Sequence, residues 1–140
     1  MNVDGILTLQ TVTGTGLRFE ARFASGFTTV IDSGHEAVAP SPVENLLGAL
    51  AACEAMDVLS ILRKKRQDIT AYEVVMSGER AETHPRRYTA IHLVHRLTGH
   101  GVSEAAVAEA VKLSREKYCS VHHTLDPNMP VTDRIEILEA

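Results

Sequence analysis

"SPVENLLGALAACEAMDVLSILRKKRQ", from Ser41 to Gln67, is a long and mostly apolar segment that carries signals for both ends of a helix. Ser41 and Glu44 match a capping box, in which each side chain bonds the other residue's backbone N–H, and Pro42 suits the first helical position. The basic residues from Arg63 onward favour the helix C-terminus, where the helix dipole stabilises cations. The sequence therefore predicts one helix over 41–67. Because its apolar residues cover more than one face, we expect it to be buried.

The segment upstream of this helix alternates between apolar and polar residues in the way that strands do. In "LRFEARF" (17–23) the apolar side chains fall on one face, while Arg18 and Arg22 fall on the other with a glutamate between them. "FTTVID" (27–32) reads as a further strand, and the "TGTG" turn (13–16) separates both from an earlier one. These patterns predict an N-terminal β-meander of about three strands.

The segment downstream predicts three more strands and a second helix. "DITAYEVVMSGER" (68–80) and "RYTAIHLVHRLTG" (87–99) form a β-hairpin across the turn-like "AETHP" (81–85). Ser103 caps a helix that is expected to run to Cys119, and "TDRIEIL" (132–138) is expected to be the final strand. The order is β-β-β-α-β-β-α-β. Because the strands come in groups, the predicted class is α+β.

Composition limits the kinds of protein that this chain can be. Its 140 residues suit a single domain over 1–140, and 44% of them are hydrophobic. Fourteen basic against eighteen acidic residues give a net charge of −4, which argues against a nucleic-acid binder. The start "MNVDGILTLQ" lacks the basic region of a signal peptide, and no stretch reaches about 18 uncharged apolar residues. We expect a cytoplasmic protein with no membrane partner. The apolar helix over 41–67 further predicts a homodimer that shares it.

The two cysteines leave two interpretations open. Cys53 lies within the predicted central helix, and Cys119 lies 66 residues later. In the cytosol structural disulfides are rare, so both cysteines are either small buried residues or reactive thiols. A reactive Cys53 requires a cation to stabilise its thiolate, because the neighbouring acidic residues on the helix disfavour a second negative charge. Arg18 and Arg22, on the polar face of their strand, are the candidates.

The sequence gives little support for a metal or a cofactor. There is no C-x-x-C and no H-x-H motif, and no glycine-rich phosphate loop follows a strand. His92 and His95 are three residues apart, so on a strand they should point to opposite faces. His122 and His123 are expected in a polar surface loop. We therefore expect neither a metal nor a bound cofactor.

Three segments together resemble one protein family. They are "SPVENLLGALAACEAMDVLSILRKKRQ", "GERAETHPRRYTAIHL" and "LSREKYCSV", and the resemblance runs from about Phe19 to Leu138. They are similar to the OsmC/Ohr family (osmotically inducible protein C and organic hydroperoxide resistance protein), and more to the general OsmC-like branch than to true Ohr. The resemblance implies an OsmC-like α+β fold, an intertwined homodimer and a thiol-dependent peroxidase. Such an enzyme reduces organic hydroperoxides in oxidative stress defence, with an external thiol or dithiol as reductant.

The resemblance also implies roles for particular residues. Cys53 matches the cysteine that attacks the peroxide, and Cys119 matches the resolving cysteine. The family uses an arginine from the N-terminal strands, for which Arg18 and Arg22 are the candidates. It also uses a glutamate at the start of the central helix, for which Glu44 is the nearest match.

Two departures from the family pattern keep other functions open. Glu44 stands nine residues before Cys53 rather than ten, so it is either a site residue or only a helix cap. Ser120 follows Cys119, where the Ohr branch has proline. One alternative is a non-catalytic redox sensor or stress protein that uses the same cysteines. The other is a dimer that binds an apolar ligand and has inert cysteines.

Overall fold

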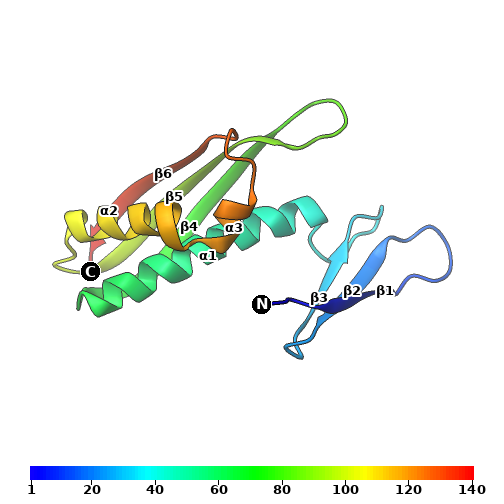
Figure 1. The fold of residues 1–140 in the computed structure, drawn as a ribbon, viewed down its shortest axis with the longest axis horizontal. Helices are drawn as coiled ribbons and strands as arrows, with labels where there is room; N and C mark the ends of the chain where they lie inside the picture. The colour runs from blue at the N-terminus through cyan, green and yellow to red at the C-terminus, as the bar shows by residue number, and fades with distance from the viewer. The chain divides into compact units, whose positions relative to one another are not determined.

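The computed structural model describes residues 1–140 and shows the α+β class that the sequence predicted. Its six strands form two three-stranded sheets. The chain divides into two compact units, Met1–Leu46 and Leu47–Ala140, which we call unit 1 and unit 2. In Figure 1 the colour runs from blue to cyan through unit 1 and from green to red through unit 2. A single domain over 1–140 stays a prediction.

Unit 1 contains the β-meander that the sequence predicted. Its strands are β1 (Gly5–Leu9), β2 (Arg18–Phe23) and β3 (Thr28–Asp32), paired antiparallel in the order β1-β2-β3. The turn between β2 and β3 places Gly26 at φ 93°, a left-handed conformation that side chains other than glycine rarely adopt. The meander therefore follows from alternating side chains together with turns at the expected positions.

The central helix α1 (Pro42–Lys64) starts with the predicted capping box. The Ser41 N–H donates to Glu44 Oε1 at 3.0 Å, and the Glu44 N–H donates to Ser41 Oγ at 3.2 Å. At the other end, the backbone leaves the helix through Arg66, whose φ is 57°. The helix is therefore slightly shorter than the predicted range 41–67, because its two ends lie outside the regular hydrogen-bonding pattern.

In the single chain α1 is buried along one side. Only one stripe of the helix is buried, formed by Leu50, Ala51, Glu54, Val58 and Leu62. Met56 on another side is 70% exposed, because a single sheet and a single helix cover only one side of α1. By length and mean hydropathy α1 could also cross a membrane, but core helices of soluble proteins share that property, so the indication is weak.

Unit 2 is built on the sheet β4-β5-β6. β4 (Asp68–Arg80) and β5 (Tyr88–His100) form the predicted antiparallel hairpin, and β6 (Val131–Glu139) pairs with β5 in parallel. A parallel neighbour requires a crossover connection, and the helical segment between β5 and β6 supplies it. The predicted strands 87–99 and 132–138 agree with β5 and β6 to within one residue at each end.

The second predicted helix is interrupted, which corrects its expected run to Cys119. The structure has α2 (Glu104–Leu113), then a π-helical turn η1 (Ser114–Tyr118), and then a short helix α3 (Ser120–Thr124). Cys119 itself is extended, with φ −72° and ψ 100°, and caps α3. His122 and His123 therefore lie in α3 and not in the expected polar loop. Local hydrophobic periodicity gave no signal for this break.

Two apolar clusters fill the core of unit 2, and in Figure 1 α1 and α2 run alongside the sheet that they cover. The first cluster joins α1 and α2 to β5, and its members are Val58, Leu62, Leu97, Ala106, Val107, Ala110 and Val111. The second joins the N-terminal half of α1 to β5, Cys119 and the start of β6, and its members are Leu50, Ala51, Ile91, Leu93, Cys119 and Val131. One of the two cysteines thus belongs to the core.

Replacing Leu62 by alanine should lower the free energy of unfolding by about 2–5 kcal/mol, because the side chain is fully buried and its truncation leaves a cavity. Leu138→Ala is the matched control, since Leu138 is 63% exposed and its truncation should change stability by less than about 0.5 kcal/mol. Urea denaturation followed by circular dichroism measures both. Equal losses in the two variants would contradict the packing described for α1.

Candidate functional site

The fold brings the two cysteines together. The Sγ atoms of Cys53 and Cys119 and a carboxylate oxygen of Asp57 all lie within 4.8 Å of one another. Cys53 and Asp57 are one helical turn apart on α1, so they share a face, and Cys119 arrives from the extended residue between η1 and α3. Both thiols are free, Cys53 half-buried and Cys119 fully buried. The structure therefore juxtaposes one accessible and one enclosed sulfur.

The surroundings of Cys119 keep its thiol protonated. Burial raises the pKa of Cys119 to about 12, although the backbone N–H of His122, which donates to its Sγ at 3.3 Å, works in the opposite direction. The presence of Cys53 raises the pKa of Cys119 further. Cys119 is therefore a thiol at neutral pH, and Cys53 is the sulfur that a reagent from solvent meets first.

The π-helical turn η1 connects this region to α1 through one hydrogen bond. Ser114, the first residue of η1, is fully buried, and its Oγ donates to Asp57 Oδ2 at 2.8 Å. The Cys119 N–H donates to the carbonyl of Ser114 at 2.8 Å, so the same residue also fixes the backbone of the second cysteine. Single π-helical turns are often found at functional sites. Here the turn positions both Asp57 and Cys119.

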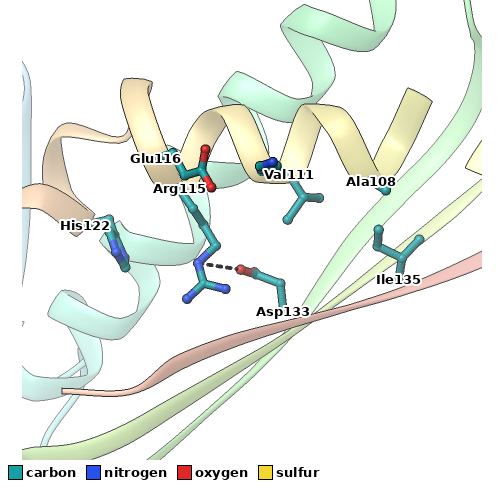
Figure 2. Close-up of a pocket in the computed structure, with 8 residues that line it drawn as sticks. Ala108, Val111, Arg115, Glu116, His122, Asp133 and Ile135 are labelled. Carbon is teal, nitrogen blue, oxygen red and sulfur yellow. Dashed lines mark ion pairs between the residues drawn. The ribbon is translucent and has the colours of Figure 1, made fainter. Parts of the chain in front are cut away.

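A buried ionic cluster lies next to the cysteines in the core of unit 2. His95 Nε2 is 2.9 Å from Asp133 Oδ1 and 3.4 Å from Glu54 Oε1. Its other ring nitrogen, Nδ1, is 2.6 Å from the hydroxyl of Tyr72. Arg115 Nε lies 3.2 Å from Asp133 Oδ2 (Figure 2). The side chains of Glu54 and His95 have no solvent exposure, so these two members of the cluster are held away from water.

Burial and mutual contact shift the pKa values in this cluster. Burial raises the pKa of Glu54 to about 7. Burial alone would lower the pKa of His95, but its contacts with Asp133 and Glu54 raise it to about 9. Burial alone would raise the pKa of Asp133, but its contacts with His95 lower it. At neutral pH the imidazole therefore carries a positive charge between the two carboxyl groups. Neither oxygen of Glu54 accepts a hydrogen bond.

A cavity of about 570 Å³ opens beside this cluster, between the α2–η1 segment and β6 (Figure 2). Figure 2 shows Arg115 reaching from η1 to Asp133 on β6. The residues that line it are Ala108, Val111, Lys112, Arg115, Glu116, His122, Asp133 and Ile135. Neither cysteine belongs to this lining. The cavity therefore gives access to the ionic cluster through Asp133 and is separate from the thiols.

The remaining site residues predicted from sequence lie in unit 1. Glu44 is exposed and engaged in the capping box. Arg18 Nε lies 3.4 Å from Asp32 Oδ2. The Arg22 side chain is 69% exposed, and its guanidinium Nη2 lies 3.7 Å from Glu20 Oε1. The roles of Glu44, Arg18 and Arg22 beside the Cys53 thiol stay predictions.

Sequence reasoning missed the buried ionic cluster, although two signals pointed to parts of it. Glu54 occupies a four-residue repeat with Leu50, Val58 and Leu62, so it is a carboxylate inside an apolar stripe. His95 occupies an apolar alternation on β5, and its predicted opposite orientation to His92 is confirmed, since His95 is buried while the His92 side chain is 45% exposed. Nothing local indicated that Asp133 would meet them.

Comparisons with known proteins agree with this fold. A family profile described as "OsmC-like protein" matches residues 33–133. Protein YhfA of Escherichia coli K12 is 44% identical over 125 residues, which cover 89% of this chain and 93% of that protein. A hypothetical protein from Aquifex aeolicus VF5 has a TM-score of 0.81 at 29% identity, covering 99% of this chain and 96% of the other. An organic hydroperoxide resistance protein from Elizabethkingia anophelis has a TM-score of 0.64 at 7% identity, covering 100% and 97%, and shares the fold alone.

In folded, reduced protein, an alkylating reagent should modify Cys53 much faster than Cys119. Cys119 is buried and its pKa is about 12, so at pH 7 only about 10⁻⁵ of it is thiolate, the form that reacts. Intact mass and peptide mapping after timed quenching measure the two rates. Cys119→Ser should label at the wild-type rate and Cys53→Ser hardly at all, while in denaturant both thiols react. Equal labelling of both cysteines in the folded state would contradict this assignment.

Proposed function

Because the chain belongs to the OsmC-like protein family, we propose that it is a thiol-dependent peroxidase that reduces organic hydroperoxides by a two-cysteine mechanism. The observation that supports this most is the pair of free thiols, which lie within 4.8 Å of each other although they are 66 residues apart in sequence. Their unequal burial assigns different roles: the half-buried Cys53 meets the peroxide, and the buried Cys119 reacts afterwards. The function we propose is defence against oxidative stress.

In the first step the Cys53 thiolate attacks one oxygen of the hydroperoxide. The O–O bond breaks, a sulfur–oxygen bond forms, and the departing alkoxide takes a proton to become an alcohol. The sulfur is thereby oxidised by two electrons to a sulfenic acid. A cation stabilises both the thiolate and the developing alkoxide, and we assign this role to Arg18 or Arg22. Arg18 already pairs with Asp32, so Arg22 has the freer guanidinium.

In the second step Cys119 condenses with the sulfenic acid. A disulfide forms and one water leaves, which protects Cys53 from irreversible over-oxidation. The sulfurs must approach from within 4.8 Å to about 2.05 Å, the length of a disulfide bond. Cys119 loses its proton in this step, and the Asp57 carboxylate, near both sulfurs, is positioned to pass that proton to the departing hydroxyl group, which leaves as water. An external dithiol then returns two electrons by thiol–disulfide exchange.

The apolar surroundings of the thiols favour alkyl hydroperoxides over hydrogen peroxide. Leu47 and Val74 are among the partly buried residues packed with Cys53 against the second core cluster. An alkyl chain that leaves water for such a surface gains about 0.8 kcal/mol for each buried CH₂ group. The substrate that we propose is therefore an organic hydroperoxide whose alkyl part lies against the apolar wall beside Cys53.

We propose that the protein is a cytoplasmic homodimer. Several large apolar side chains are exposed in the single chain, including Met56 on α1 at 70% and, in unit 1, Ile6 at 71% and Phe27 at 77%. Exposed apolar surface of this kind commonly marks an interaction site. Sedimentation at micromolar concentration should therefore give about twice the chain mass of 15.3 kDa. A species with the mass of one chain across that concentration range would contradict the dimer.

One equivalent of tert-butyl hydroperoxide added to the reduced protein should remove two hydrogens from the intact mass and consume both free thiols, because a disulfide forms between Cys53 and Cys119. Cys119→Ser should instead gain one oxygen atom, and Cys53→Ser should not change. Rapid quenching followed by mass spectrometry measures this. Unchanged mass with two persistent thiols would overturn the proposal and favour a dimer that binds an apolar ligand.

Two further measurements refine the result. Steady-state consumption of hydroperoxide with a dithiol separates an enzyme from a redox sensor, which forms the disulfide but does not turn over.

Glu44→Gln removes the charge while glutamine still completes a capping box, so thermal stability should stay constant. If the Glu44 carboxylate acts at the thiol, Cys53 oxidation in this variant slows by about tenfold or more, within the range of other acid–base contributions. An unchanged rate would leave Glu44 as a helix cap only.

A further inference from the structure

The ionic cluster of Glu54, His95 and Asp133 supplies no group to the thiol steps proposed above, and it contains a buried carboxylate whose oxygens accept no hydrogen bond. Glu54 has no solvent exposure, and neither of its carboxylate oxygens accepts a hydrogen bond. Its ion-pair contact is Oε1 to His95 Nε2 at 3.4 Å, and Asp133 Oδ1 lies closer to that nitrogen, at 2.9 Å. A buried carboxylate that accepts no hydrogen bond is costly, because it has lost its hydration. A buried charge of this kind is normally paired or bound to a metal ion. We propose that Glu54, His95 and Asp133 bind one first-row divalent metal ion, of the class of Zn²⁺, Fe²⁺ or Mn²⁺.

The three side chains converge with the spacing that a metal ion requires. Ligand atoms about 2.0–2.2 Å from a metal lie about 3.0 Å apart at a right angle and about 3.4 Å apart at the tetrahedral angle. His95 Nε2 lies 2.9 Å from Asp133 Oδ1 and 3.4 Å from Glu54 Oε1. One ligand atom from each residue lies within 4.8 Å of the other two. An imidazole with two carboxylates suits borderline and hard ions, whereas thiolates select softer ones.

The atoms that face away from this centre already have partners. The Tyr72 hydroxyl is 2.6 Å from His95 Nδ1, and Arg115 Nε is 3.2 Å from Asp133 Oδ2. Metal ligands are commonly oriented in this way, because contacts to the outer atoms fix the rotamer and leave the inner atom free to coordinate. The inner atoms are His95 Nε2 and Asp133 Oδ1. Glu54 completes the set, and its oxygens accept no hydrogen bond.

The cavity beside the cluster provides a route for the ion. Asp133 is part of the lining of the cavity of about 570 Å³ between the α2–η1 segment and β6, and Arg115 holds its outer oxygen there (Figure 2). An ion from solvent therefore reaches the cluster past the Asp133 carboxylate. The thiols do not line this route, so the metal site does not rest on the proposed peroxidase function.

A second group of potential ligands, Cys53, Asp57 and Cys119, provides the rival location for an ion. The two sites have different spectroscopic signatures. A Co²⁺ ion bound by an imidazole and two carboxylates shows visible d–d bands only. A Co²⁺ ion bound by thiolates also shows intense sulfur-to-metal charge-transfer bands in the near ultraviolet.

The test uses the full chain, stripped with a chelator, reduced and titrated with Co²⁺ alone. We expect one Co²⁺ per chain, visible d–d bands, no thiolate charge-transfer bands, and displacement by Zn²⁺. Glu54→Gln and His95→Gln should each weaken binding by more than about tenfold, since even the loss of an outer contact commonly costs about 10–100-fold. His92→Gln is the matched control, the same change at a solvent-facing histidine of the same strand, and Cys119→Ser should keep the wild-type spectrum.

The wild-type protein alone is sufficient to overturn the proposal, even if the variants fold poorly. Electron spin-echo modulation of bound Mn²⁺ should detect a coordinated imidazole nitrogen. Absence of the d–d bands even at a large excess of Co²⁺ would show that Glu54, His95 and Asp133 bind no metal ion and are held together by ion pairs alone. Charge-transfer bands that disappear in Cys119→Ser would place the ion at the cysteines. Either result would overturn the site, and neither decides whether Cys53 reacts with hydroperoxides.

Discussion

The packing of one face of α1 against β5 is the contact on which unit 2 depends. Residues 50, 54, 58 and 62 lie on one side of the helix at four-residue spacing, and all four are fully buried. Three are aliphatic and one is Glu54, so the same stripe that forms the core also carries a carboxylate into it. Because the interior is close-packed, the stripe fixes the orientation of the whole helix. Cys53 and Asp57 are therefore placed at the edge of the core.

The interruption of the second helix is equally important, because it turns Cys119 toward α1. In a continuous α-helix through residues 104–119, each residue would be rotated by the same angle about a straight axis. The chain would then continue along that axis past Tyr118. The π-helical turn and the extended Cys119 end that regularity. The Ser114 hydroxyl joins the turn to Asp57 by a side-chain hydrogen bond. The Ser114 carbonyl accepts a backbone hydrogen bond from the Cys119 N–H. The thiol pair is thus positioned by an irregular element and not by a regular one.

The chain places two chemically different groups next to each other in a small core. One group is the pair of soft sulfur atoms with different accessibility, which suit oxidation and exchange. The other is an imidazole with two carboxylates, which suits protons or metal ions. Glu54 follows Cys53 directly in sequence, and its charge contributes to the raised pKa of Cys119. Any change in the charge of the cluster therefore acts on the second thiol.

Much of the fold was predictable because its signals are local. Alternation predicted the strands, the Ser41–Glu44 pattern predicted the start of α1, and the quoted segments were sufficient to indicate the OsmC-like family. The opposite faces of His92 and His95 also followed from the two-residue period of a strand. These features depend on residues within a few positions of one another. At such short separations the backbone geometry alone determines which side chains share a face.

The sequence by itself thus determined the strands, the central helix, the order of the main elements, and two cysteines in apolar surroundings. Only the tertiary structure decided that those cysteines meet, and that Glu54, His95 and Asp133 meet beside them. Both meetings depend on the parallel pairing of β6 with β5 and on the broken crossover helix between them, which bring together residues about 40 to 80 positions apart. No local pattern encodes such contacts, because they arise from how whole elements pack and not from the spacing of neighbouring side chains.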